Sequence, residues 1–171
     1  MKWKYETIYN RFCEVPMKAL NATFNTVVST LEVNPTGAPE FIDITDQVNE
    51  AVRNSGINNG IAVVFSRHTT AAVTIQENEP LLLNDLATLL ERLSPRNSRY
   101  GHNDFSIRTV HMQEDECPNG HSHCQHIVLG TSESIPVISG ELPLGQWQRI
   151  FVVELDDQKS RREVLVQIMG V

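Results

Sequence analysis

Residues 150–155 read Ile-Phe-Val-Val-Glu-Leu (IFVVEL) and are apolar on both faces of a strand except at Glu154. A short, continuous apolar run of this kind is typical of a strand that is buried on both faces, so it predicts a central strand of a sheet. A carboxylate in such a strand is costly unless it is paired. Glu154 therefore either pairs with an arginine, with Arg161 and Arg162 as candidates, or belongs to a functional site.

The rest of the chain has the pattern of a β-rich domain. Val164, Val166 and Ile168 alternate with their neighbours, as in a strand with one buried face. The turn-rich residues 34–39 would join the first two strands as a hairpin. We expect about eight strands, at residues 22–33, 40–44, 60–66, 71–76, 126–130, 135–139, 147–155 and 163–169.

Two helices are expected between these strands. Thr45 or Asp46 can cap a helix that runs to about residue 54, and Gly56 follows as a left-handed end. A second helix begins at Glu79-Pro80, because proline is tolerated in a first turn. Its apolar face consists of Leu83, Leu86, Leu90 and Leu93. These elements predict an α+β fold: an antiparallel β-sandwich of about eight strands with the two helices packed on one sheet.

Composition narrows the class of protein. The chain has 171 residues, about one domain, with a formal net charge of −7 and no basic patch that would bind nucleic acid. It has no apolar run of roughly 18 residues and no signal-peptide pattern at its start, which argues against a membrane protein. Three cysteines without a CxxC pair favour a reducing compartment. We therefore expect a cytoplasmic protein without nucleic-acid or membrane partners.

The stretch Asn119-Gly120-His121-Ser122-His123-Cys124-Gln125-His126 holds three of the six histidines. In an extended segment His121 and His123 would lie on one face. Two imidazoles joined by a third, from His68 or His102, could hold a catalytic zinc ion and leave one position open for water.

This histidine stretch follows a long segment, residues 94–123, that lacks a clear period. Such a loop in a compact domain is usually functional or mobile. The alternative to a metal site is a solvent-facing turn, whose histidines bond to nearby carboxylates such as Asp115 and Glu116.

Residues 67–71 (RHTTA) come where an apolar strand ends. His68 offers a titratable group near neutral pH, and Thr69 and Thr70 offer hydroxyls that can bind an anion. The alternative is a strand end in which the threonines only favour β geometry.

Two further motifs have a structural and a functional interpretation. Glu77 can be a base, a ligand or a partner of a histidine, whereas Asn78 and the acidic residues beside it also suit the start of a helix. Trp147 is either part of the core or stacks on a flat ligand in the pocket, with Gln148 beside it.

Four spaced motifs together resemble the YjbQ family, also called UPF0047 or secondary thiamine-phosphate synthase-like. The motifs are His68-Thr69-Thr70-Ala71, Glu77-Asn78-Glu79, Asn119-Gly120-His121-Ser122-His123, and Gly145-Gln146-Trp147-Gln148-Arg149-Ile150 with Glu154 and Asp156. The resemblance covers a single domain at residues 22–171 and leaves 1–21 as an N-terminal extension.

The resemblance implies a compact α+β sandwich, usually a homotrimer, whose polar motifs gather in one pocket. It also implies a weak ability to make thiamine phosphate in some members. His102 and the Asp115-Glu116-Cys117 run would extend the pocket. The expected site comprises His68, Glu77 and His123 as catalytic residues, Thr69, Thr70, Asn78, Asn119, Trp147 and Gln148 as ligand-binding residues, and His102, His121 and His123 as metal ligands.

These residues support more than one class of function. An enzyme would bind a phosphorylated or pyrophosphorylated small molecule and transfer an alkyl group from a pyrimidine methyl pyrophosphate to a thiazole nitrogen, a step that depends on neutralising the leaving group. Histidines favour zinc over magnesium, so metal-assisted hydrolysis is a further possibility. The alternatives are a non-enzymatic trimer that binds a metabolite or a metal ion, and a purely structural trimer whose histidines serve packing.

Overall fold

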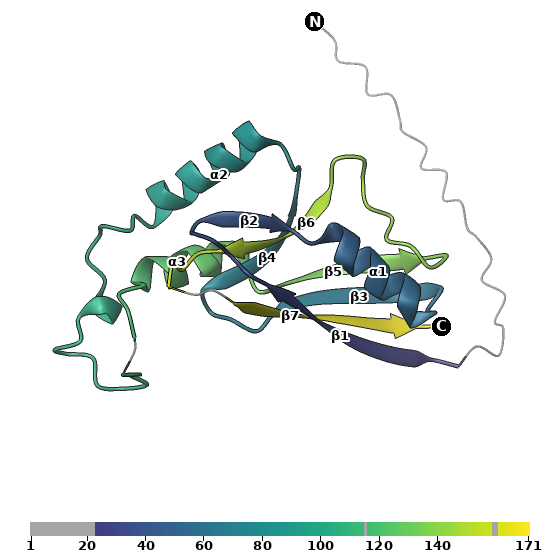
Figure 1. Cartoon of the computed structure of the whole chain (residues 1–171), viewed down its shortest axis with the longest axis horizontal. Coiled ribbons are helices and arrows are strands. Elements are labelled where there is room, and N and C mark those ends of the chain that lie inside the picture. The colour runs from purple at the N-terminus through teal and green to yellow at the C-terminus, as the bar shows by residue number, and fades with distance from the viewer. Residues whose placement is uncertain (1–22, 115, 159–160) are drawn as a thin grey trace, which may run out of the picture.

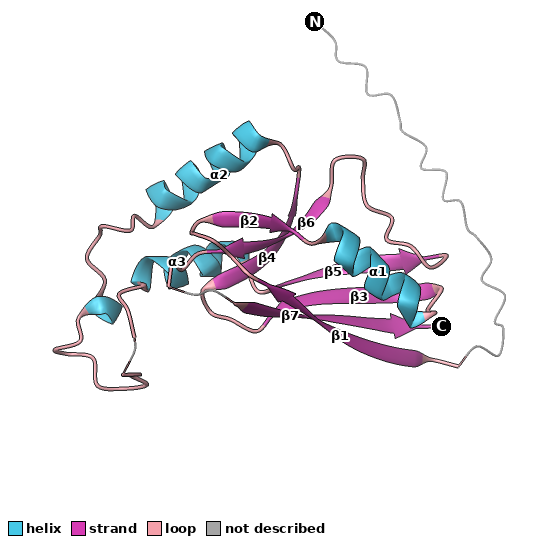
Figure 2. Cartoon of the chain, in the orientation of Figure 1, coloured by secondary structure: helices cyan, strands magenta, loops and turns pink. Residues whose placement is uncertain are grey.

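The computed structural model describes residues 23–114, 116–158 and 161–171. The expected extension at residues 1–21 and Asp115 lie outside this part of the chain. The described chain is a mixed α/β structure with three α-helices and two antiparallel sheets (Figures 1 and 2). The strands are β1 (Asn25–Val33), β2 (Glu40–Asp43), β3 (Asn59–Ser66), β4 (Ala71–Gln76), β5 (Ser132–Ile138), β6 (Arg149–Glu154) and β7 (Arg162–Gly170), and the helices are α1 (Thr45–Ser55), α2 (Pro80–Leu93) and α3 (Gly120–Leu129), with a short 3-10 turn η1 at Gly101–Asn103.

The smaller sheet has the order β2-β6-β4, with β6 in the middle. Ile150 and Val152 face the core between the two sheets, and Phe151 and Val153 pack under Leu90 of α2. Both faces of β6 are thus buried, and the prediction of a central strand at IFVVEL is confirmed.

The larger sheet has the order β1-β7-β3-β5. Its inner face carries Ala62, Val64, Val164, Val166 and Ile168, all fully buried. The alternate residues face outward, and among them Val28 is 56% exposed and Phe65 is 40% exposed. Within the described residues no helix or strand covers this outer face, as Figure 2 shows.

Helix α1 packs against the core between the sheets through Val48 and Val52. It ends as expected, because Gly56 adopts a left-handed conformation with φ of 69°. The predicted caps at Thr45 and Asp46 are wrong. The carboxylate of Asp43 instead accepts from the backbone N–H of Thr45 at 3.0 Å and from its hydroxyl at 2.6 Å.

Helix α2 begins at Pro80, as predicted, but leans away from the body of the molecule (Figure 1). Its N-cap is Glu79, which accepts from the backbone N–H groups of Leu81 and Leu82, and not Asn78. Leu90 of the expected apolar face is buried, whereas Leu93 is largely exposed. No described helix is long and apolar enough to cross a membrane.

Two predictions about local structure are wrong. Residues 126–130 do not form a strand, because most of them belong to helix α3, so seven strands are found in the described chain. Residues 22–33 and 40–44 do not form a hairpin: β1 pairs with β7 and β2 pairs with β6, in different sheets. The two helices that cover one sheet are α2 and α3, while α1 contacts β7, β1 and β6.

Candidate functional site

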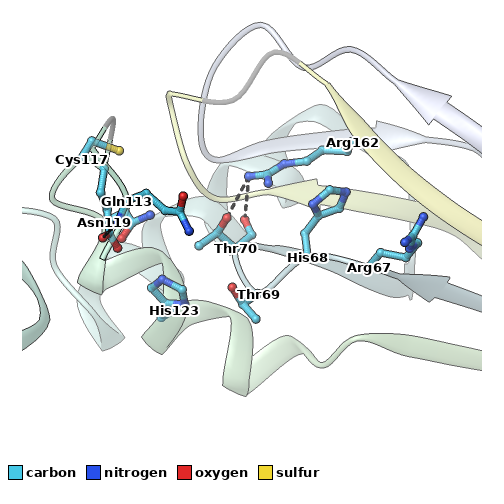
Figure 3. Close-up of a pocket in the computed structure, with 10 residues that line it drawn as sticks. Arg67, His68, Thr69, Thr70, Gln113, Cys117, Asn119, His123 and Arg162 are labelled. Carbon is cyan, nitrogen blue, oxygen red and sulfur yellow. Dashed lines mark hydrogen bonds between the residues drawn. The ribbon is translucent and has the colours of Figure 1, made fainter. Parts of the chain in front are cut away.

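A polar cavity of about 340 Å³ lies where β3, β7 and α3 come together. One wall comes from the connection between β3 and β4 and from the start of β7. The other comes from the loop before α3 and from α3 itself (Figure 3). The lining residues are Arg67, His68, Thr69, Thr70, Gln113, Glu116, Cys117, Asn119, His123 and Arg162.

Arg162 is held rigidly at the back of this cavity. Its Nε and Nη2 atoms donate to the carboxylate of Glu154, and Nη2 also donates to the hydroxyl of Thr70 at 2.9 Å. Glu154 is fully buried and Arg162 is 3% exposed. Within the described chain the Nη1 atom has no hydrogen-bond partner, which leaves its two N–H groups for whatever occupies the cavity.

His68 lies beside this guanidinium (Figure 3). The backbone N–H of Glu163 donates to its Nε2 atom at 2.8 Å. Burial lowers the pKa of His68 below its ordinary value, and the positive charge of Arg162 acts in the same direction, against the weaker effect of Glu154. The ring is therefore neutral at physiological pH.

Helix α3 decides which histidines of the 119–126 stretch reach the cavity. Because residues two apart on a helix point in different directions, His123 lines the cavity and His121 is buried elsewhere. The helix begins where the side-chain oxygen of Asn103 accepts from the backbone N–H of Gly120 at 2.8 Å. The predicted shared face of His121 and His123 is thus wrong.

His102 meets His123 from the side, with 4.7 Å between the ring centroids. The guanidinium of Arg108 links this pair to the cavity wall, since its Nη1 atom lies 3.3 Å from Nε2 of His102 and 2.6 Å from the carboxylate of Glu116. The structure therefore brings two of the three expected metal ligands together. Among the residues with described positions, no group of three or more His, Cys, Asp or Glu side chains could hold a metal ion.

Asn119, Thr69 and Thr70, three of the residues that we expect to bind a ligand, also line the cavity. The side-chain amide of Asn119 donates to Asp156 at 2.8 Å, which fixes its orientation, and its oxygen is buried without a hydrogen-bond partner in the described chain.

Burial lowers the pKa of His123, and the neighbouring His102 acts in the same direction.

Four expected site residues lie at the opposite end of the smaller sheet. Ala71 of β4 is opposite Glu154 of β6, near the cavity, whereas Gln76 is opposite Arg149. The five residue steps from Ala71 to Gln76 place the two ends about 17 Å apart. The residues beyond the far end are Glu77, Asn78, Trp147 and Gln148.

The hydrogen bonds of Asn78 and Gln148 stay at this end of the sheet. The amide of Asn78 donates to Asp43 at 2.9 Å, and Gln148 accepts from the backbone N–H of Gly145 at 2.8 Å. Trp147 is 64% exposed, so it is not part of the core of this chain. None of the four lines the cavity described above.

The sequence did not predict three residues of the cavity, namely Arg162, Arg67 and Gln113. One signal pointed to Arg162, because Glu154 in an apolar strand requires a partner. No comparable signal exists for Arg67, which pairs with Glu163 at 2.8 Å at the rim. Glu116 and Cys117 lie where the resemblance placed them.

Comparison with known proteins agrees with this fold. A UPF0047 protein of Methanothermobacter thermautotrophicus is 43% identical over 131 residues, which cover 77% of this chain and 83% of that protein. YugU of Bacillus subtilis, also a UPF0047 protein, is 30% identical over 145 residues, 84% of this chain and 100% of that protein.

Solved structures give the same result. A YbjQ-like protein of unknown function from Sulfolobus solfataricus P2 superposes with a TM-score of 0.78 at 34% identity, over 87% of this chain and 100% of the other. A hypothetical protein of Aeropyrum pernix K1 superposes with a TM-score of 0.70 at 32% identity, over 86% and 99%. The family model described as "UPF0047 protein YjbQ-like" matches residues 29–171, and the chain therefore belongs to that family.

Proposed function

We propose that the cavity binds a phosphorylated or pyrophosphorylated small molecule. The observation that carries this proposal is the guanidinium of Arg162, which is almost fully buried, is fixed by Glu154 and Thr70, and lines the cavity with Nη1 unused. On a planar guanidinium held in this way, Nη1 offers its two N–H donors to the oxygens of a phosphate group.

Further hydrogen-bond donors line the same cavity. Arg67 adds a second positive charge at the rim, and Thr69 adds a hydroxyl. Much of the charge of Arg162 is balanced by Glu154, so the site recognises an anion by oriented N–H groups more than by net charge. This fits a protein whose overall charge of −7 would otherwise repel a phosphate.

The same donors could serve a reaction in which pyrophosphate leaves. In the alkyl transfer that forms thiamine phosphate, a bond from carbon to the pyrophosphate oxygen breaks and a bond from that carbon to the thiazole nitrogen forms. The chain would stabilise the negative charge on the departing pyrophosphate through Arg162 and Arg67. We propose weak activity of this kind. The alternative is a non-enzymatic protein that binds the same class of metabolite without turnover.

A divalent metal, zinc rather than magnesium, is the second ligand that we propose for this region. It rests on the contact between His102 and His123, because imidazole nitrogens suit zinc. The described residues supply these two ligands and no third. Elemental analysis of the purified protein and of His123→Ala tests this: the wild type should retain zinc and the variant should lose it, with His111→Ala as a matched control on the exposed loop.

We also propose that the chain forms a homotrimer in the cytoplasm. The outer face of the larger sheet supports assembly, since Val28, Ile61 and Phe65 form an apolar surface that nothing in the described chain covers. The absence of a CxxC pair among three cysteines supports a reducing compartment.

Thermal unfolding with and without pyrophosphate tests the proposed ligand class. Pyrophosphate and inorganic phosphate should raise the unfolding temperature, and sulfate at equal ionic strength should raise it less if the site favours phosphate. Synthesis of thiamine phosphate from its two precursors then separates an enzyme from a binding protein. Equal temperatures with and without each anion would contradict the proposal.

A further inference from the structure

His68 joins the sheet ladder at the point where β3 separates from β7. Ser66 is the last residue of β3 opposite β7, where it pairs with Val164. The next residue, Arg67, donates its backbone N–H to the carbonyl of Glu163 at 3.4 Å. A regular antiparallel pair would return a bond from the N–H of Glu163 to the carbonyl of Arg67. That N–H instead donates to Nε2 of His68 at 2.8 Å.

This contact determines where the imidazole carries its proton. A backbone N–H can only donate, so Nε2 must present its lone pair. A neutral imidazole has one protonated nitrogen, which is then Nδ1. The lowered pKa of the ring, caused first by burial and then by Arg162, favours the neutral form over the imidazolium. Within the described residues no group accepts from Nδ1, and His68 lines the cavity beside Arg162.

We infer that His68 is a fixed hydrogen-bond donor through Nδ1–H, which binds an acceptor oxygen of the ligand, and that it is neither a general base nor a metal ligand. A nitrogen that carries a proton has no lone pair for a metal or for another proton. This inference rests on the proposed function only for the identity of the ligand, because the protonation state is a property of the protein alone.

The second histidine of the cavity is not constrained in this way. His123 has no hydrogen bond from either ring nitrogen to a described residue, and it lines the opposite wall. The two histidines thus differ in kind: the sheet fixes His68 as a donor, whereas His123 keeps a lone pair for a ligand.

Nitrogen NMR of the full-length protein tests the inference directly. Long-range proton–nitrogen correlation spectra of ¹⁵N-histidine-labelled protein near pH 7.5 distinguish a ring protonated at Nδ1 from one protonated at Nε2. His68→Asn identifies the signals of His68 by their loss. We expect Nδ1 protonated and Nε2 unprotonated. Protonation of Nε2, alone or together with Nδ1, overturns the inference.

A pair of amide variants tests the same assignment by binding. The side-chain nitrogen of asparagine can occupy the position of Nδ1, whereas glutamine reaches the position of Nε2. In titrations with pyrophosphate, the affinity of His68→Asn should therefore lie within about 3-fold of the wild type. The affinity of His68→Gln should be about 10-fold weaker, because the loss of one hydrogen bond costs roughly 1.4 kcal/mol. The reverse order overturns the inference. Wild-type protein that binds no pyrophosphate would contradict the proposed function, while the NMR result would still decide the protonation of His68.

Discussion

Arg162 and Glu154 form an ion pair that is almost completely buried behind the wall of the cavity. Glu154 also accepts from the backbone N–H groups of Leu155, at 2.9 Å, and Asp156, at 2.7 Å, so the chain after β6 is fixed by the same carboxylate. One buried pair thereby connects the core of the smaller sheet to the donors that face the cavity.

Loss of the carboxylate should destabilise the protein strongly. In Glu154→Gln the charge of Arg162 stays buried without a counter-ion, and we expect the free energy of unfolding to fall by about 3–5 kcal/mol. The matched control is Glu32→Gln, which removes an exposed partner of Arg161 and should cost less than about 1 kcal/mol. Urea denaturation of both variants measures the difference, and equal losses would show that the buried pair has no special role.

The start of α3 should tolerate no side chain at position 120. A Cβ atom on Gly120 would lie 2.7 Å from the Cβ atom of Tyr100 and 3.0 Å from the oxygen of Asn103. We expect Gly120→Ala to destabilise the chain by about 1–3 kcal/mol, as for other overpacked sites. Gly37→Ala is the control, because no atom lies within 4 Å of its added Cβ. A Gly120→Ala variant as stable as Gly37→Ala in urea would contradict the placement of α3 against Tyr100.

Stability should fall as the solution becomes mildly acidic. Burial is the largest cause that lowers the pKa of four histidines: His68, His121, His123 and His126. Between their folded pKa values and the ordinary value of about 6.5, the unfolded chain binds more protons than the folded chain. The contribution of these four histidines to the free energy of unfolding is therefore complete above about pH 6.5 and is lost as the pH falls through their folded pKa values.

Urea denaturation at several pH values between 7.5 and 5.5 measures this effect. The free energy of unfolding should decrease across this interval, and His121→Gln should show a smaller decrease than the wild type because one buried imidazole is gone. A protein that gains stability on acidification over the same interval would contradict the burial of these rings.

The uncovered face of the larger sheet should control assembly. Phe65 lies on this face near the end of β3, between Ser132 of β5 and Leu165 of β7. A charge at this position cannot be buried against a neighbouring chain without a large cost. We expect Phe65→Lys to convert the proposed trimer to a monomer in light scattering coupled to size-exclusion chromatography. Leu81→Lys, on the exposed start of α2, should leave the oligomer unchanged; loss of assembly in that variant alone would place the interface on the helices.

Strand and helix positions were largely predictable because each depends on a local pattern. The apolar run at 150–155 predicted a central strand, and Pro80 marked the first residue of α2. Residues 126–130 were mistaken for a strand because Ile127, Val128 and Leu129 favour β structure when taken alone. The helix there depends on a distant contact, from Asn103 to the first N–H of α3, that no local pattern reveals.

The site was predictable only in part for a related reason. Sequence motifs identify residues but not which end of a strand each one reaches. Thr70 and Glu77 lie on either side of β4, so the strand that joins two expected site motifs also holds them apart. Arg162 reaches the cavity because β7 pairs with β3, which is far from it in the sequence. The only local indication of a partner for β6 was Glu154, a carboxylate in an otherwise apolar strand.

Titration calorimetry with pyrophosphate, on the wild type, Arg162→Lys and Arg161→Lys, tests the central claim most directly. Lysine at position 162 keeps a positive charge for Glu154 but lacks the guanidinium donors. The account predicts that Arg162→Lys remains folded and binds at least about 10-fold more weakly, whereas Arg161→Lys, changed in the exposed neighbour, binds like the wild type. Equal affinities for all three proteins would contradict it.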